Sequence, residues 1–147
     1  MIRSFRESDS KEIENIYEKS NSALSLNVSS GFFEKDKKNF TSSTIRHCKN
    51  LVFEDKNRIL GIISYSYNYI EGLFVTPEFW NLGIGSELLN RVFSEKRELH
   101  LQVYSDNARA LGFYRKHGFE ISGKGVCQMT GLPYFEMTWC KKGTVEP

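Results

Sequence analysis

Two glycines placed directly in front of an amphipathic run limit most strongly how this chain can fold. Residues 80–89 read WNLGIGSELL, with Gly83 and Gly85 two positions apart. Neither glycine carries a Cβ, so the backbone there can turn tightly and approach a ligand closely. The segment behind them repeats apolar residues on one helical face: Ile84, Leu88, Leu89, Val92 and Phe93. The pattern predicts a loop that leads into a helix, whose first N–H groups favour an anion.

Several ligands fit such a loop. A dinucleotide-binding fingerprint needs a third glycine where this chain has Leu88. A P-loop needs Lys and then Ser or Thr after the second glycine, and Ser86-Glu87 does not supply them. A helix start at which glycine merely relieves crowding also fits. The glycine pair alone does not decide among these readings.

The rest of the chain alternates strand and helix signals. Strands are predicted at 2–5, 51–54, 59–67, 69–75, 99–104, 119–126 and 134–140. Asp9 with Glu12 resembles a capping box that opens a helix to about Ser20. Asn107 caps a second helix that Gly118 ends, whereas residues 22–50 suggest one or two short helices. This order predicts a mixed α/β (α+β) fold with a mostly antiparallel central sheet flanked by helices.

Composition excludes several classes of protein. At 147 residues, a single domain spanning 1–147 is expected. A net charge of +2 with scattered basic residues makes a nucleic-acid partner unlikely. Three cysteines and three histidines are too widely spaced for a disulfide framework or a metal site. No apolar run approaches the roughly 20 residues of a membrane span, and the first ten residues lack the apolar core of a signal peptide, so a cytoplasmic protein is expected.

A second motif narrows the choice for the loop. Residues 107–119 read NARALGFYRKHGF, one strand and one helix after the glycines. Together the two segments resemble the GNAT superfamily of N-acetyltransferases, which move an acetyl group from acetyl-CoA to an amine. The loop pattern of that family is Gln or Arg, two residues, Gly, one residue, and Gly or Ala. The chain departs from it at Trp80, which is expected to pack against the cofactor or the strand end.

The resemblance implies a set of cofactor contacts. Backbone groups of the loop would hold the pyrophosphate of coenzyme A: Asn81, Leu82, Gly83, Ile84, Gly85 and Ser86. The segment Leu73, Phe74 and Val75 would pair with the pantetheine arm and polarise the acetyl carbonyl. Asn107 would contact the same arm, and Tyr114 would both contact the cofactor and give a proton to the departing thiolate. No metal is implied.

The acceptor end is less defined by the resemblance. Strand alternation predicts that Tyr69, Glu71, Leu73 and Val75 share one face of 69–75. Members of the family place a base, or a residue that orders water, at positions matching 69 and 71, which makes Glu71 the candidate base. Another site that some members use carries Gln102 here, which cannot act as a base. Phe32, Tyr69 and Tyr134 are expected to line the acceptor site.

Three functions follow from these residues. The first is an acetyl-CoA-dependent N-acetyltransferase acting on a primary amine, either a small molecule or a protein lysine or N-terminus, by direct attack in a ternary complex. The second is an acyl-CoA-binding sensor with little turnover, suggested by Trp80 and Gln102. The third is a toxin of the same fold that acetylates aminoacyl-tRNA. Exposed strands in the C-terminal hairpin also make a homodimer one expected arrangement.

Overall fold

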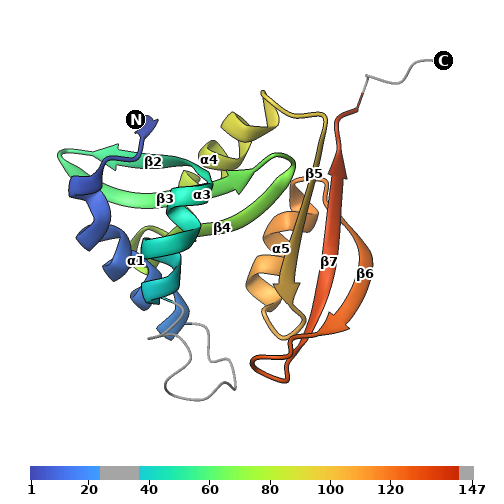
Figure 1. Ribbon diagram of the computed structural model, residues 1–147. Coiled ribbons are helices and arrows are strands. Elements are labelled where there is room, and N and C mark those ends of the chain that lie inside the picture. Colours follow the sequence, from blue (N-terminus) through green and yellow to red (C-terminus); the bar gives the residue numbers. More distant parts are fainter. Residues whose placement is uncertain (24–36, 143–147) are drawn as a thin grey trace.

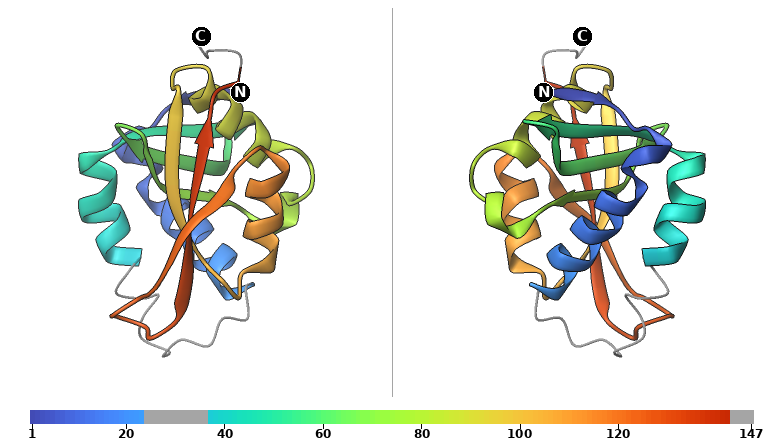
Figure 2. Two further views of the ribbon diagram at one scale, coloured as in Figure 1. Left: turned by 90° about the vertical axis from the view of Figure 1, so that its right-hand side faces the viewer. Right: turned by 90° about the vertical axis from the view of Figure 1, so that its left-hand side faces the viewer.

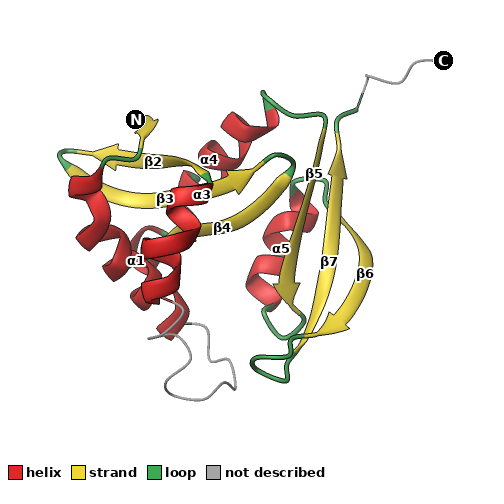
Figure 3. Cartoon of the chain, viewed as in Figure 1, coloured by secondary structure: helices red, strands yellow, loops and turns green. Residues whose placement is uncertain are grey.

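The computed structural model describes residues 1–23 and 37–142 and shows one sheet with helices on both faces (Figures 1 and 3). The strands are β1 (Ile2–Ser4), β2 (Lys49–Asp55), β3 (Arg58–Ser66), β4 (Tyr69–Val75), β5 (Glu98–Tyr104), β6 (Glu120–Val126) and β7 (Pro133–Cys140). The helices are α1 (Ser10–Ser22), α3 (Ile45–His47), α4 (Ile84–Phe93) and α5 (Ala108–Lys116). Short turns of helix are η1 (Glu7–Asp9), η2 (Phe40–Thr44) and η3 (Pro77–Phe79). No described helix is both long and apolar enough to span a bilayer.

The seven strands follow the order β1-β2-β3-β4-β5-β7-β6. Every neighbouring pair is antiparallel except β4 and β5, which run parallel. The parallel pair therefore joins two antiparallel groups, β1–β4 and β5–β7, which diverge from each other in Figure 1. The predicted mixed α/β fold with a mostly antiparallel sheet is confirmed.

Helices cover both faces of the sheet (Figure 2), and each face carries its own apolar core. On one face, α4 and α5 cover buried residues of β3, β4, β5 and β7, with Leu88, Leu99 and Met137 fully buried at the centre. On the other, α1, η2 and α3 cover β2 and β3 around Ile13 and Ile62. Burial of these aliphatic side chains supplies the main stabilising free energy of the fold.

Local signals account for most of the element ends. Lys56 and Asn57 both have positive φ, 50° and 63°, as a tight two-residue hairpin between β2 and β3 requires. The side chain of Asn107 accepts a hydrogen bond from the amide of Ala110, so its predicted capping role is confirmed. Gly118 follows α5 with a φ of 95°, which ends the helix as predicted.

The predicted capping box at the start of α1 is wrong. Asp9 occupies the N-cap position but makes no side-chain bond to the helix. Its carboxylate instead accepts two bonds from the Arg3 guanidinium, at 2.9 and 3.0 Å, and one from the amide of Arg6. Glu12 likewise accepts from the amide of Ile59 on β3, at 3.0 Å. Both carboxylates serve tertiary contacts, which attach α1 to the sheet.

Candidate functional site

The parallel strands β4 and β5 separate almost at once. Their register contains a single pair, Tyr69 with His100, next to a bond from the amide of His100 to the carbonyl of Asn68 at 2.8 Å. Beyond that point β4 continues to Val75 along β3 alone. The edge of β4 that faces β5 therefore presents backbone groups to an extended ligand, as in strand addition.

The direction of these groups follows from a bond at the end of the strand. The amide of Thr76 donates to the carbonyl of Leu60 on β3 at 2.9 Å. Successive residues of a strand point their N–H and C=O groups to opposite sides. Phe74 therefore also points its backbone groups at β3, whereas Leu73 and Val75 point theirs into the opening between β4 and β5. Of the predicted segment Leu73–Val75, only these two residues direct backbone groups into the opening, while the Phe74 ring packs on Tyr17 and Phe40.

The glycine loop lies directly after this strand. Asn81 and Gly83 have positive φ values of 66° and 90°, and Gly83 is the N-cap of α4 without a side-chain cap. The first intrahelical bond there runs from the amide of Glu87 to the carbonyl of Gly83. The amides of Ile84, Gly85 and Ser86 precede it and have no intrahelical acceptor, so this helix end suits an anion.

Helix α5 packs against the loop, and Gly85 permits this. A Cβ added at Gly85 would stand 3.3 Å from the ring of Phe113. Further along α5, the Nε2 of His117 lies 2.9 Å from the Ser86 hydroxyl, while its Nδ1 lies 2.8 Å from the carbonyl of Phe113. A carbonyl only accepts, so Nδ1 carries a proton and the first turn of α4 is tied to the end of α5.

Trp80 packs against the strand end, one of its two expected positions. Its indole Nε1 donates to the carbonyl of Val75 at 2.7 Å. Arg109 on α5 stacks on the Trp80 ring, with its guanidinium carbon 3.9 Å from the ring centre. An Arg109 nitrogen also lies 3.3 Å from the Asn81 side-chain oxygen. Sequence reasoning missed Arg109, although it lies two residues after Asn107 in the second motif.

Tyr114 lies in the apolar core that α4 and α5 cover. Its side chain is buried against Phe113 and Phe119, in edge-on ring contacts at 5.2 and 5.3 Å. Burial raises the pKa of the Tyr114 phenol above its usual value, so the group stays protonated even in mildly alkaline solution. No hydrogen bond among the described residues engages its hydroxyl, which leaves a proton donor without a protein acceptor.

The predicted alternation along β4 is wrong because of a bulge. Ser64 pairs with Gly72 and Tyr65 with Ile70, so Glu71 is an extra residue opposite one step of β3. Ile70 packs in the same core as Leu73 and Val75, which strict alternation would forbid. The face of Leu73 and Val75 is therefore continued by Ile70, and the predicted grouping of Tyr69 and Glu71 with them does not hold. A bulge of this kind re-aims a side chain and is common beside active sites.

A cluster of two tyrosines and two carboxylates forms where β4, β5 and β7 meet. Burial raises the pKa of Tyr69 to about 12, and the charges of Glu71 and Glu136, with Tyr134, add to the rise. Tyr69 thus lies within electrostatic reach of Glu71, the candidate base, and of Tyr134, which was expected to line the same acceptor site. Glu136 was missed, although it stands two residues after Tyr134 on the same strand. Phe32 lies outside the described residues.

Glu136 also lies beside Gln102, the position that departs from the family pattern. These residues are directly opposite each other on β5 and β7, and the Gln102 amide donates to the Glu136 carboxylate at 3.4 Å. A carboxylate thus lies beside the position at which the resemblance expects one, but on the neighbouring strand. The cluster contains two candidate bases, Glu71 and Glu136, both exposed to solvent.

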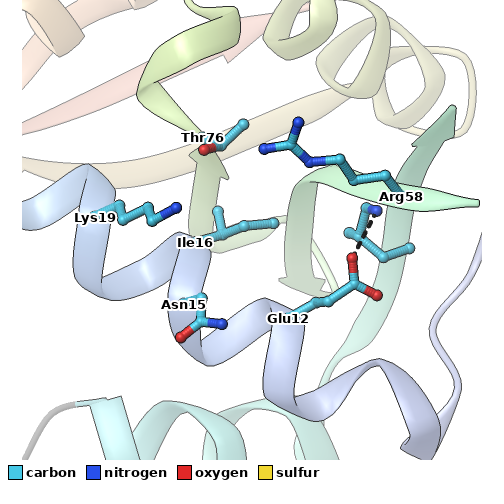
Figure 4. Close-up of a pocket in the computed structure, with 7 residues that line it drawn as sticks. Glu12, Asn15, Ile16, Lys19, Arg58 and Thr76 are labelled. Carbon is cyan, nitrogen blue, oxygen red and sulfur yellow. Dashed lines mark hydrogen bonds between the residues drawn. The ribbon is translucent and has the colours of Figure 1, made fainter.

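A separate pocket of about 120 Å³ lies between α1 and the start of β3 (Figure 4). Its lining includes Glu12, Lys19, Arg58 and Thr76. Glu12 is already bonded to the amide of Ile59, and Arg58 is paired with Glu78 at 3.0 Å. The charges of Glu12 and Arg58 thus serve contacts within the fold. Among the described residues, no three metal-ligating side chains gather at one place.

Comparison with known proteins identifies the family to which this sequence is similar. The sequence model of the Acetyltransferase (GNAT) family matches residues 11–119. The peptidyl-lysine N-acetyltransferase YiaC of Escherichia coli is 31% identical over 96 residues, which cover 65% of this chain and 66% of that protein. The peptidyl-lysine N-acetyltransferase YjaB of the same organism is 30% identical over 80 residues, which cover 54% of each chain. The matched stretches thus span less than two thirds of these relatives.

Solved structures show the same fold over nearly the whole chain. The apo form of YjaB from Escherichia coli has a TM-score of 0.83 at 23% identity and covers 95% of this chain and 96% of its own. The PaiA N-acetyltransferase of Thermoplasma acidophilum, solved with coenzyme A, has a TM-score of 0.78 at 18% identity and covers 96% and 98%. At these identities the likeness concerns the fold alone.

Proposed function

Because the chain belongs to the GNAT acetyltransferase family, we propose that it transfers an acetyl group from acetyl-CoA to a primary amine by direct attack in a ternary complex. The observation that carries this proposal is the early separation of β4 from β5 next to a glycine loop at a helix start. The opening and the loop together suit a long ligand with an anionic end.

The residues present fit acetyl-CoA. The N–H groups of Leu73 and Val75 would bind the pantetheine arm, while the Val75 carbonyl is already held by Trp80. The free amides at the start of α4 would bind the pyrophosphate. Acetyl-CoA, when bound, supplies the thioester carbonyl that the amine attacks.

The tyrosine and carboxylates divide the proton transfers between them. An amine with a pKa near 10 is mostly protonated at neutral pH, so Glu71 or Glu136 takes its proton directly or through water. The nitrogen then forms a bond to the acetyl carbon while the carbon–sulfur bond breaks. Tyr114 donates a hydrogen bond to the departing thiolate, and the second proton of the nitrogen ends on that sulfur. The products are an amide, a free thiol and one proton released to solvent.

We propose a cationic acceptor, with a peptidyl lysine as the leading case. Two carboxylates and two tyrosines at one site favour a positively charged group over a neutral or anionic one. The printed names of two relatives, both peptidyl-lysine N-acetyltransferases, support the same choice. A chain with net charge +2 and scattered basic residues gives no comparable support to an aminoacyl-tRNA acceptor.

The test begins with ligand binding. Acetyl-CoA at about 100 times its dissociation constant should stabilise the fold by roughly 2.7 kcal/mol and raise the thermal midpoint, whereas NAD and ATP should not. Thiol release with a lysine peptide should then exceed release with the same peptide carrying norleucine in place of lysine. A shift without turnover on any amine would favour an acyl-CoA sensor. No shift with acetyl-CoA would contradict the proposal.

A further inference from the structure

The position at which the resemblance expects Gln or Arg holds Trp80, which leaves the mouth of the loop without a cation of its own. The structure places a cation there from another element. Arg109 comes from the first turn of α5 and stacks on the Trp80 ring at 3.9 Å, with a nitrogen 3.3 Å from the Asn81 side-chain oxygen. Asn81 is one of the loop residues, so the guanidinium lies at the edge of the proposed pyrophosphate site.

Stacking holds the guanidinium without using up its donors. Arginine has five N–H donors in its plane, and a ring face engages none of them. The bond to Asn81 uses one, which leaves an edge of donors on an exposed side chain. Trp80 is itself fixed by its bond to the carbonyl of Val75 at 2.7 Å. A pre-positioned guanidinium loses little conformational entropy when it binds an anion.

We propose that Arg109, held by Trp80, binds a phosphate of coenzyme A. This inference rests on the proposed function. It assigns to the Trp80–Arg109 pair the anchoring that a Gln or Arg at position 80 would give, with the charge moved from the loop to α5. Planar donors of arginine match phosphate oxygens in pairs, which makes such contacts strong and directional. The phosphate is either the pyrophosphate or the 3′-phosphate of the cofactor.

The central experiment measures the affinity for acetyl-CoA by calorimetry in Arg109→Gln. We expect the dissociation constant to rise by about 10- to 100-fold, and its dependence on salt to weaken, because one ionic contact is lost. Arg115→Gln is the matched control, since it removes an exposed arginine from the last turn of the same helix. It should bind acetyl-CoA as the unchanged protein does.

Substitution of Trp80 tests the pairing. Trp80→Phe keeps a ring for the guanidinium but loses the bond to the Val75 carbonyl, so it should weaken binding less than Trp80→Leu, which removes the stack as well. The effect of Trp80→Leu should largely vanish when Arg109 is already Gln, since the two residues act together. Thermal midpoints of all variants without ligand show whether each one is folded.

Measurements with a second ligand distinguish the two phosphates. If the loss in Arg109→Gln persists with 3′-dephospho-acetyl-CoA, Arg109 contacts the pyrophosphate; if it disappears, Arg109 contacts the 3′-phosphate. The inference is overturned if Arg109→Gln binds acetyl-CoA as tightly as the unchanged protein, or if Arg115→Gln loses as much. If the unchanged protein does not bind acetyl-CoA at all, the proposed function itself fails, which is a different result.

Discussion

Tyr114 illustrates how one buried side chain can serve chemistry. Burial raises the pKa of its phenol, so the proton stays in place through the pH range in which an amine substrate works. In the proposed reaction, the thiolate that leaves acetyl-CoA needs only a hydrogen-bond donor, since a thiol has a lower pKa than a phenol. The residue is thus suited to give a hydrogen bond rather than to become charged.

We expect Tyr114→Phe to lower kcat by about 10- to 100-fold while leaving the affinity for acetyl-CoA within a few fold. The ring contacts with Phe113 and Phe119 remain, so the thermal midpoint should change little. Steady-state kinetics and calorimetry on the same sample check both parts. An unchanged kcat would remove Tyr114 from the proposed chemistry.

Substitution by alanine should have opposite effects on stability at Gly83 and Gly112. Gly83→Ala forces a side chain into a backbone with a φ of 90° and should destabilise the fold by about 1 kcal/mol. Gly112→Ala lies inside α5 with no atom near the added methyl, and should stabilise by about 0.5–1 kcal/mol. Urea unfolding of both variants measures the difference. Equal effects would contradict the assigned role of Gly83.

At the residue scale, the sequence predicts contacts made by neighbours in the chain better than contacts between distant segments. Asn107 was predicted to cap α5 because its partner is three residues away. Arg109 and Glu136 were missed because their partners, Trp80 and Gln102, lie 29 and 34 residues away. Only the fold determines that such pairs meet.

Among the elements, β4 shows why a correct strand prediction can still misplace side chains. Its bounds, Tyr69–Val75, agree with the prediction. The bulge at Glu71 changes the alternation inside the strand, and it arises from the register with β3. Nothing within residues 69–75 encodes that register, which depends on how the preceding turn joins the two strands.

The stability of the fold should depend on pH through Asp9 at the start of α1. Arg3 lowers the pKa of Asp9 below its usual range, mainly through hydrogen bonds, so the folded state favours the ionised carboxylate. Its stabilisation is full above the unfolded value near 4 and is lost as the pH falls below it. Asp9→Asn should cost roughly 2–3 kcal/mol at neutral pH and flatten the acid side of the stability profile. Urea unfolding between acid and neutral pH checks this, and an unchanged acid profile would contradict it.

On the scale of the whole molecule, the two strand groups β1–β4 and β5–β7 share a single ladder pair between β4 and β5. Acetyl-CoA would lie between them and contact both. We therefore expect the amides of Leu73 and Val75 to exchange hydrogen more slowly when acetyl-CoA is bound, by more than the ligand slows exchange within the β2–β3 pairing. Exchange followed by mass spectrometry tests this, and uniform slowing throughout the sheet would argue against a ligand in the opening.

The stacked indole at the loop has an optical consequence. The chain has only two tryptophans, and the other, Trp139, stacks on Phe93 at 4.0 Å on the far strand β7. Trp139→Phe would leave Trp80 as the sole strong fluorophore, in contact with the guanidinium of Arg109, for which we propose a cofactor phosphate as partner. The emission of that single side chain would then follow cofactor arrival and departure in real time, with no added dye and no coupled assay.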